Sequence, residues 1–432
     1  MPRTQPSSPD WMTDAAWIST RLPVESASAL PAACYVAEDF HDLELERVWG
    51  TSWVCVATTD ELRPPSPRSS PSTPSTPSTP STEGGQRPLL VREVAGRSIL
   101  ITSDADGELR AFHNACRHRG TQLAACDGSI ASVIRCPYHR WGYSLTGELI
   151  ATPRFEDVPL TDFDRADYPL HAARIDAWGP LVFVCLDDEA PPLSSWLGDL
   201  PQRLAGYELD GWSVRDRIDV TIDANWKLVS ENFQEYYHLP FVHPELAKVS
   251  RVEDHYRFQG AGMYCGQCTT PVSSDQRDDW TAMPPAAALS RSDAASGRFL
   301  ALFPNVLLSI LPNHVFAMIL QPDGPGRTLE QAIWFVPPMS NPTDAQFAAT
   351  REFWLEVNSE DIDIVERGQR GLQAGRYTPG RLSARFEEPL HRFHNMLADR
   401  MTGASRIPTG DASDDVDLFG AGRNPLPWRP AV

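Results

Sequence analysis

The stretch from Cys116 to Tyr143, CRHRGTQLAACDGSIASVIRCPYHRWGY, decides how the first half of this chain folds. It contains two matched pairs, Cys116 with His118 and, after seventeen intervening residues, Cys136 with His139. Two thiolates can hold one iron of a 2Fe-2S cluster while two imidazoles hold the other iron. A Cys2His2 zinc site uses the same atoms, but such sites usually pair Cys with Cys and His with His. The spacing therefore predicts a His-ligated 2Fe-2S cluster, with zinc as the alternative.

The residues around these loops predict a β domain followed by a mixed domain. Residues 89–187 alternate short β-type runs with turns of Gly, Asp and Pro. After Pro191 come long β runs between residues 299 and 336, and a long helix is expected from Thr343 to about Ala374. The fold class is therefore α+β, with an antiparallel sheet in the second domain.

The expected division has three parts. Residues 1–47 form an N-terminal segment, in which 38–49 read as a short helix, packing on the catalytic domain. Residues 48–188 form the cluster domain, and 189–432 form the catalytic domain. Within the cluster domain, the Ser-Thr-Pro repeat of residues 64–85 has no apolar surface to bury, which predicts a disordered insertion.

Composition limits the partners and the compartment. A formal charge of -19 argues against binding to the phosphate backbone of nucleic acid. No run approaches the roughly 20 apolar residues of a membrane span, and the N-terminus lacks a signal-peptide pattern. Cysteines placed beside histidines indicate metal ligands rather than disulfides. We therefore expect a soluble protein of the reducing cytoplasm.

The sequences CRHRG at 116–120 and CPYHRWGY at 136–143 resemble the Rieske iron-sulfur family. Rieske subunits of respiratory complexes carry an extra cysteine in each loop, where this chain has Thr121 and Tyr138, so the oxygenase branch is the better match. The resemblance covers roughly residues 35–400. It implies a Rieske β domain inserted into a helix-grip catalytic domain, an antiparallel sheet around a long helix, with a mononuclear iron.

The segment NWKLVSENFQEYYHLPFVHP, residues 225–244, contains the expected iron ligands. Its apolar period predicts a helix that Pro240 interrupts, with His238 near the helix end and His243 just past the break. Two histidines and one carboxylate suit Fe(II) with open positions for oxygen and substrate. A lone His pair is more often ordinary packing, but this run resembles the iron motif of Rieske oxygenases, which also has an acid at the place of Glu235.

The third ligand must be a distant carboxylate, and two aspartates of the long helix compete. Asp361 shares a helical face with Val365 and can point inward. Asp363 lies four residues before Arg367, which favours an exposed ion pair. We prefer Asp361 and keep Asp363 as the alternative. The resemblance agrees, because family members carry the ligand in an acidic pair five residues before a Glu.

The resemblance also implies how the sites cooperate. Electrons from NAD(P)H would arrive through a separate flavin or iron-sulfur reductase, since the chain shows no Gly-rich dinucleotide fingerprint. A homotrimer is implied, in which the cluster of one subunit lies beside the iron of the next. Glu235 would bridge His139 of one subunit and His238 of the other, acting as a catalytic residue.

The iron motif looks most like that of bacterial oxygenases acting on quaternary ammonium compounds such as glycine betaine and carnitine, although those relatives often have Cys where this chain has Tyr236 and Leu239. Oxidative N-demethylation or hydroxylation of such a compound is the first choice. Alternatives are hydroxylation of an aromatic or natural-product substrate, and an electron carrier without oxygenase activity. Tyr236, Tyr237 and Phe241 are candidates to hold the cation against aromatic faces.

Two further groups of metal-ligand types are interpreted as structural. Cys265 and Cys268 form a C-x-x-C without a second pair at metal spacing. Glu387, His391 and His394 share one face of a C-terminal helix, which we interpret as an exposed amphipathic face rather than a metal site.

Overall fold

The computed structural model describes residues 10–63, 85–157, 161–250, 252, 255–269, 283–291, 293–338 and 340–407. The chain divides into two compact units, Val54–Ala190 and the combination of Met1–Trp53 with Pro191–Val432. Residues 48–53, which the sequence assigns to the cluster domain, group with the second of these units. Residues 64–84 of the proposed insertion lie outside the described residues.

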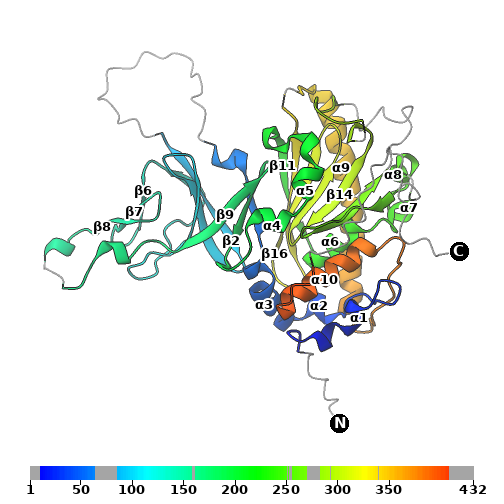
Figure 1. Cartoon of the computed structure of the whole chain (residues 1–432), viewed down its shortest axis with the longest axis horizontal. Coiled ribbons are helices and arrows are strands. Elements are labelled where there is room, and N and C mark those ends of the chain that lie inside the picture. Colours follow the sequence, from blue (N-terminus) through cyan, green and yellow to red (C-terminus); the bar gives the residue numbers. More distant parts are fainter. Residues whose placement is uncertain are drawn as a thin grey trace, which may run out of the picture. The chain divides into compact units, whose positions relative to one another are not determined.

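The unit Val54–Ala190 is built of antiparallel strands (Figure 1). One sheet has the strand order β1-β10-β9-β4-β3-β2-β5, and a smaller sheet has the order β6-β7-β8. The strands are β1 (Val54–Thr58), β2 (Arg87–Val94), β3 (Arg97–Ser103), β4 (Leu109–His113), β5 (Gly128–Ile130), β6 (Val133–Arg135), β7 (Gly142–Ser144), β8 (Leu149–Ala151), β9 (Ala172–Trp178) and β10 (Leu181–Cys185). The two Cys/His loops follow β4 and β6, so the predicted β domain is confirmed.

The other unit contains a seven-stranded antiparallel sheet in the order β11-β17-β16-β15-β14-β13-β12. Its strands are β11 (Ser213–Ile222), β12 (His255–Arg257), β13 (Tyr264–Thr269), β14 (Gly297–Leu302), β15 (Val306–Ile310), β16 (Val315–Pro322) and β17 (Thr328–Val336). The described helices are α1 (Ile18–Arg21), α2 (Ala33–Val36), α3 (Glu38–Arg47), α4 (Leu193–Leu197), α5 (Leu200–Arg203), α6 (Trp226–Gln234), α7 (Leu239–Val242), α8 (Pro244–Val249), α9 (Asp344–Gln373) and α10 (Glu388–Thr402). The α+β class with an antiparallel sheet is confirmed.

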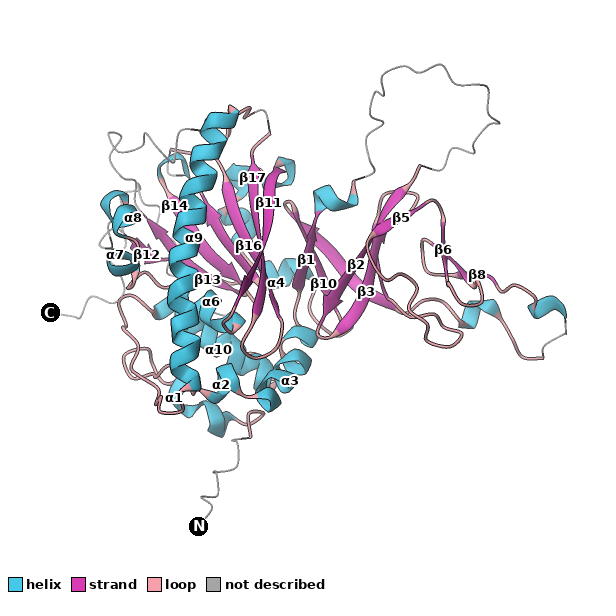
Figure 2. Ribbon diagram, turned by 180° about the vertical axis from the view of Figure 1, so that it is seen from behind, coloured by secondary structure: helices cyan, strands magenta, loops and turns pink. Residues whose placement is uncertain are grey.

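Helix α9 is the long helix that the sequence predicts, and it runs along this sheet (Figure 2). It begins at Thr343, whose side chain accepts from the backbone N–H of Gln346 in a capping box. Trp354 and Val365 of α9 pack in one core with Phe316 and Trp334 of the sheet. The apolar face of α9 therefore fixes which of its polar residues reach the interior.

Helix α6 is tied to the N-terminal segment by a buried ion pair. Lys227 Nζ lies 2.8 Å from Glu44 Oε1, and Trp226 Nε1 donates to Glu44 Oε2 at 2.9 Å. Both charged side chains are fully buried, which is tolerated because each is paired and hydrogen-bonded. The predicted packing of the N-terminal segment on the catalytic domain thus has a specific anchor at α3.

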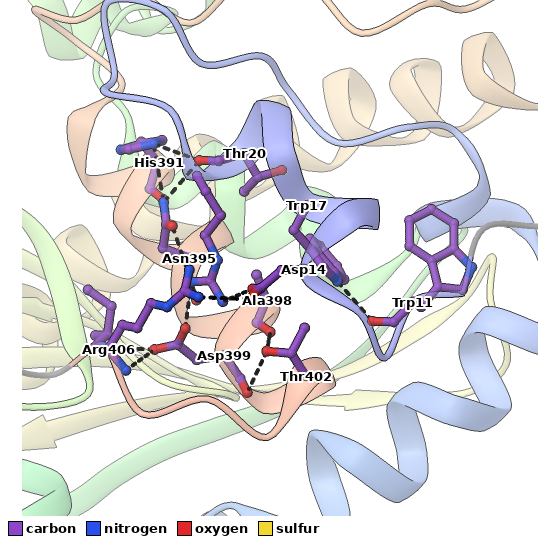
Figure 3. Close-up of polar contacts among 12 residues, drawn as sticks. Trp11, Asp14, Trp17, Thr20, His391, Asn395, Ala398, Asp399, Thr402 and Arg406 are labelled. Carbon is purple, nitrogen blue, oxygen red and sulfur yellow. Dashed lines mark hydrogen bonds and ion pairs between the residues drawn. The ribbon is translucent and has the colours of Figure 1, made fainter.

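Contacts of α10 with other elements explain the histidines that the sequence places on one helix face, and Figure 3 shows the contact of His391 with Thr20. His391 Nε2 lies 2.9 Å from the carbonyl oxygen of Thr20, and His394 Nε2 lies 2.9 Å from Glu231 Oε1. His394 is fully buried. The expectation of an exposed face is therefore wrong for His394, because the N-terminal segment and α6 cover that side of α10.

Asp399 is the most heavily bonded acid in this region (Figure 3). Its Oδ1 lies 2.5 Å from the Arg21 guanidinium, and Oδ2 accepts from the backbone N–H groups of Arg406 and Ile407 at 2.8 and 2.7 Å. We predict that Asp399→Ala lowers the free energy of unfolding by about 3 to 5 kcal/mol, because it removes the nearest carboxylate from the partly buried Arg21 guanidinium and leaves two N–H groups unpaired.

Thermal unfolding measures this loss, and Asp14→Ala is the matched control. Asp14 pairs with Arg406 at 2.8 Å but its side chain is 58% exposed, so its loss should cost less than about 1 kcal/mol. Equal melting temperatures for the two variants would contradict the assignment of Asp399 as an anchor.

Candidate functional site

The two Cys/His loops have the same backbone form. In each loop the cysteine N–H donates to a carbonyl five residues later, from Cys116 to Thr121 and from Cys136 to Trp141, both at 2.9 Å. In each loop the residue four after the cysteine has positive φ, Gly120 in the first and Arg140 in the second. The two turns therefore hold their cysteines at equivalent backbone positions, while the histidine follows two residues after Cys116 and three residues after Cys136.

The side chains of these loops converge from both turns. Cys116 and Cys136 are buried, and the rings of His118 and His139 lie 4.8 Å apart between centroids. Each loop supplies one cysteine and one histidine, whereas Cys2His2 zinc sites usually pair like with like, which favours the cluster over the zinc alternative.

Two aromatic residues, Trp141 and Tyr143, contact the predicted cluster ligands of the first loop. Trp141 stacks on His118, with ring centroids 4.7 Å apart and an interplanar angle of 11°. The hydroxyl of Tyr143 accepts from the backbone N–H of Arg117 and lies 3.2 Å from Cys116 Sγ. Burial raises the pKa of Tyr143, so its phenol keeps its proton and can donate to the sulfur.

We predict that Tyr143→Phe lowers the reduction potential of the cluster. A hydrogen bond to a ligand sulfur stabilises the reduced, more negative cluster, and about 1 kcal/mol of lost preference corresponds to roughly 40 mV for one electron. Spectroelectrochemical titration measures the shift. Tyr138→Phe is the control, because that exposed ring stacks on His139 and the stack survives loss of the hydroxyl; equal potentials for all three proteins would contradict the prediction.

The iron motif folds differently from the sequence prediction. Helix α6 ends at Gln234, and Glu235 is already extended, with φ -102° and ψ 159°. The carboxylate of Glu235 accepts from the backbone N–H groups of Tyr237 and His238, which competes with continuation of the helix. His238 therefore lies at the start of α7 rather than near the end of α6, and His243 lies between α7 and α8.

The structure brings His238, His243 and Asp361 together. Their ligand atoms lie within 4.8 Å of one another. Asp361 Oδ1 is 2.9 Å from His243 Nε2 and 3.6 Å from His238 Nε2, and it also accepts from Asn232 Nδ2 at 2.6 Å. Two imidazole nitrogens and one carboxylate that converge in this way fit an Fe(II) site with open positions.

Each of these histidines has a carboxylate on its other nitrogen. Glu235 Oε1 lies 2.5 Å from His238 Nδ1, and Glu360 Oε2 lies 2.7 Å from His243 Nδ1. Burial lowers the pKa of both imidazoles, but the carboxylates around each outweigh it, so both pKa values are raised. Such outer carboxylates orient ligand histidines with Nε2 toward a metal.

Sequence reasoning missed Glu360. Two facts could have identified it. Glu360 stands directly before Asp361 in the sequence, and a metal-binding histidine usually needs a hydrogen-bond partner for its second ring nitrogen. By contrast, Asp363 points away: its carboxylate pairs with Arg367 at 2.6 Å and its side chain is 57% exposed. Between the two aspartates that compete in the sequence, the structure places Asp361 at the histidines.

A pocket of ≈ 580 Å³, including its mouth, opens on the three converging residues. Its aromatic walls are Phe233, Phe299, Phe316 and Trp354, and its amides are Asn232, Gln267 and Asn358. Such a cavity, mostly apolar with a few polar groups, suits a small organic molecule.

None of the aromatic residues that the sequence proposes for this pocket is among its described lining. Tyr236 is buried elsewhere, with its hydroxyl bonded to the Arg385 carbonyl oxygen at 2.8 Å. Tyr237 and Phe241 are 50% and 76% exposed. Proximity in sequence was misleading because His238 and Leu239, in the same stretch of chain, face the cavity, whereas Tyr236, Tyr237 and Phe241 do not.

The other cysteine pair, Cys265 and Cys268, is buried and does not have the character of a metal site. Cys265 and Cys268 occupy β13, and Cys265 Sγ lies 2.8 Å from Gln234 Oε1. Burial raises the pKa of Cys265 to about 12, so it stays a thiol. Its contact with the last residue of α6 is a packing role.

Comparison with protein families matches both units of the chain. Residues 78–162 match the Rieske [2Fe-2S] domain, and residues 209–403 match the ring hydroxylating alpha subunit (catalytic domain). The chain is therefore an alpha subunit of the Rieske ring-hydroxylating oxygenases, an iron-dependent oxidoreductase with a 2Fe-2S domain and a candidate mononuclear iron site.

Its curated relatives include quaternary ammonium oxygenases. The chain is 25% identical to a glycine betaine monooxygenase oxygenase subunit of Pseudomonas aeruginosa, over 86% of this chain and 89% of that protein. It is 28% identical to a carnitine monooxygenase oxygenase subunit of Escherichia coli, over 87% and 94% respectively.

Solved structures confirm the fold but do not separate substrates. The quaternary ammonium Rieske monooxygenase CntA with L-carnitine superposes with a TM-score of 0.69 at 23% identity, covering 88% of this chain and 99% of that one. Naphthalene 1,2-dioxygenase from Rhodococcus sp. with indole superposes with a TM-score of 0.68 at 21% identity, covering 87% and 95%. In the described part of the chain, no helix is both long and apolar enough to cross a membrane.

Proposed function

We propose that this subunit oxidises a quaternary ammonium compound, by N-demethylation or hydroxylation. The observation that carries the proposal is the pocket with four aromatic walls that opens on His238, His243 and Asp361. Aromatic faces attract a desolvated cation by about 2 kcal/mol. The carboxylates of Glu235, Glu360 and Asp361 add a negative field at the same end of the pocket. The similarity to glycine betaine and carnitine monooxygenases supports the same class.

The site residues take the following roles in this proposal. Cys116, His118, Cys136 and His139 hold the cluster, and His238, His243 and Asp361 hold Fe(II). When bound, the cluster supplies single electrons and the iron supplies oxygen activation. The protein orients the iron ligands through Glu235 and Glu360, and keeps bulk water from the reacting carbon with the apolar walls of Phe233 and Phe316.

Electrons come from NAD(P)H through a separate reductase, which the alpha-subunit identity implies. We further propose a homotrimer, in which His139 of a neighbouring subunit approaches Glu235 and the carboxylate joins the two sites. The side chain of Glu235 is 12% exposed and already accepts from His238 Nδ1, which suits it to hold a second imidazole. A cytoplasmic location is proposed because Cys116 and Cys136 are placed with histidines as metal ligands, a use of cysteine that is typical of a reducing compartment.

Glu235→Gln should fold and bind both metals, yet turn over about 10- to 100-fold more slowly, because the amide keeps the shape but loses the charge that orients imidazoles. Rapid-mixing measurement of cluster oxidation in a single turnover tests this. The control is Glu245→Gln, whose carboxylate is 71% exposed and pairs with the exposed Lys248. Cluster oxidation as fast in Glu235→Gln as in the parent would remove the bridging role.

The overall reaction balances without a further oxidant. One oxygen atom of O2 enters a C–H bond as a hydroxyl, the other leaves as water, and two electrons and two protons are consumed. At an N-methyl group the resulting N-hydroxymethyl ammonium ion loses its hydroxyl proton and breaks its C–N bond, which releases formaldehyde and leaves the electron pair on the nitrogen of a tertiary amine.

A second candidate is hydroxylation of an aromatic or natural-product substrate. The stacked pair Phe316 and Trp354, with ring centroids 5.1 Å apart, offers a flat apolar face that would also hold a neutral ring. The electron-carrier alternative does not stand, because the chain carries the oxygenase catalytic domain.

The test is a panel of betaines, carnitine and neutral aromatic acids, incubated with a surrogate reductase. Formaldehyde or aldehyde release and NADH use coupled to product are scored. Demethylation or aldehyde products from any quaternary ammonium compound support the proposal. Coupled turnover with neutral aromatics alone would replace it with the second candidate.

A further inference from the structure

Glu330 is a buried carboxylate beside the pocket that the mechanism above does not use. It lies on β17, 1% exposed, between apolar register partners Val220 and Leu320. Its Oε1 accepts from Asn358 Nδ2 at 2.8 Å, whereas Oε2 is buried without a hydrogen-bond partner among the described residues. A carboxylate in such surroundings is unfavourable for folding alone, which suggests a functional reason for it.

The contact with Glu330 fixes which end of the Asn358 amide faces the pocket. In the structure Asn358 donates from Nδ2 to Glu330 Oε1, so the NH2 end of the amide faces Glu330. The carbonyl oxygen Oδ1 is then the end that remains for the pocket, which Asn358 lines. Asn358 precedes the iron-site residue Asp361 by three positions on α9, so the two side chains share one helix face.

The same face of α9 continues to an aromatic wall. Trp354 lies four residues before Asn358, and its ring stacks with Phe316. Helix geometry therefore arranges along the pocket a carboxylate at Asp361, an acceptor at Asn358 and an aromatic surface at Trp354, over about 10 Å. A molecule that has a cation and a nearby hydrogen-bond donor can contact the Trp354 ring with its cation and Asn358 with its donor at the same time.

We propose that Asn358, oriented by Glu330, selects a substrate that carries a hydroxyl or N–H donor close to its quaternary ammonium group. This rests on the proposed function and narrows its substrate class. Asn358 is the specificity-determining residue, and Glu330 is a positioning residue that acts through it. A quaternary ammonium compound whose only other polar group is a carboxylate cannot donate to Asn358, and the carboxylates near the iron site repel it. Such a compound therefore binds less well.

Choline and propyltrimethylammonium test the proposal, because they share the cation and nearly the same volume but differ by a hydroxyl in place of a methyl group. Their dissociation constants are measured by calorimetry with the anaerobic holoenzyme, so that no turnover occurs. Glu330→Leu and Asn358→Leu should each weaken choline binding about tenfold while changing propyltrimethylammonium binding less than about twofold. In the double variant the two losses should not add, because both remove the same contact.

Three variants separate positioning from a structural role. Glu330→Leu should keep its melting temperature and iron content, because replacing an incompletely bonded buried carboxylate by an apolar group is often neutral or stabilising. Glu330→Gln, which can still accept from Asn358, should retain the preference for choline. Gln331→Leu, on the opposite face of β17 where it bonds Asp219, is the control and should change neither constant.

Equal affinity of the parent for the two cations, or equal loss of both in Glu330→Leu, would overturn the inference while leaving the proposed function standing. Binding of neither cation would overturn this inference, and it would overturn the proposed function as well if the panel of betaines and carnitine also gave no product.

Discussion

Asp361→Ala should strip the mononuclear iron and abolish oxygenation while leaving the cluster spectrum intact. The carboxylate is the contact shared by the two histidines: its Oδ1 lies 2.9 Å from His243 Nε2 and 3.6 Å from His238 Nε2. Two imidazoles alone hold Fe(II) weakly, so the activity loss should exceed the 10- to 100-fold that is typical of changes to outer partners. Iron counts per subunit and coupled product formation are the measurements.

Asp363→Ala is the matched control for this change. It removes an acid from the same helix, two positions away, but that side chain is exposed and pairs with Arg367. The control should keep its iron and its activity, with a stability change of less than about 1 kcal/mol. Iron retained in Asp361→Ala and lost in Asp363→Ala would show that the wrong aspartate has been assigned.

Cys116→Ser should remove the cluster and, with it, all reductase-driven turnover. Its thiol is buried within the core of the cluster loops, and a hydroxyl is a much poorer ligand for the iron of a 2Fe-2S cluster. The protein should lose its visible absorption, its cluster EPR signal and its acid-labile sulfide. The mononuclear iron should remain near its parent level, because the ligand sets are separate.

The converse variant, His238→Ala, should keep the cluster spectrum and lose oxygenation. Cys126→Ser is the control for cysteine removal, since that residue is exposed and outside both loop turns. Zinc without acid-labile sulfide in the parent protein, or oxygenation surviving in His238→Ala, would contradict the assignment of two iron sites.

Much of the fold was determined by local pattern. Helix α9 follows its predicted span because the Thr343 cap and a long apolar period act within the segment itself. The two Cys/His loops could be matched to each other from their spacing, because each loop is a local turn. A hydrogen bond between residues five apart closes each of these turns. Choosing Asp361 over Asp363 was possible for the same reason, because helix periodicity decides which carboxylate faces inward.

Other features depended on contacts between distant segments. The end of α6 was predicted too late, because the bond from Glu235 to its own following backbone outweighed helical period. The pocket wall was predicted from neighbours in sequence, whereas Phe316 and Trp354 come from β16 and α9. His394 was placed on an exposed face, although the N-terminal segment and α6 cover it.

The sequence alone therefore determined the class of fold and the cluster loops through ligand chemistry and local period, and it identified the converging histidines through the resemblance of their motif to that of Rieske oxygenases. Only the tertiary structure decided what surrounds them. It shows the hydrogen bonds of Glu360 to His243 and of Asn358 to Glu330, and it shows which aromatic residues line the pocket. Each of these is a contact between elements far apart in the chain. Such contacts depend on how the sheet packs against α9, which no local pattern encodes.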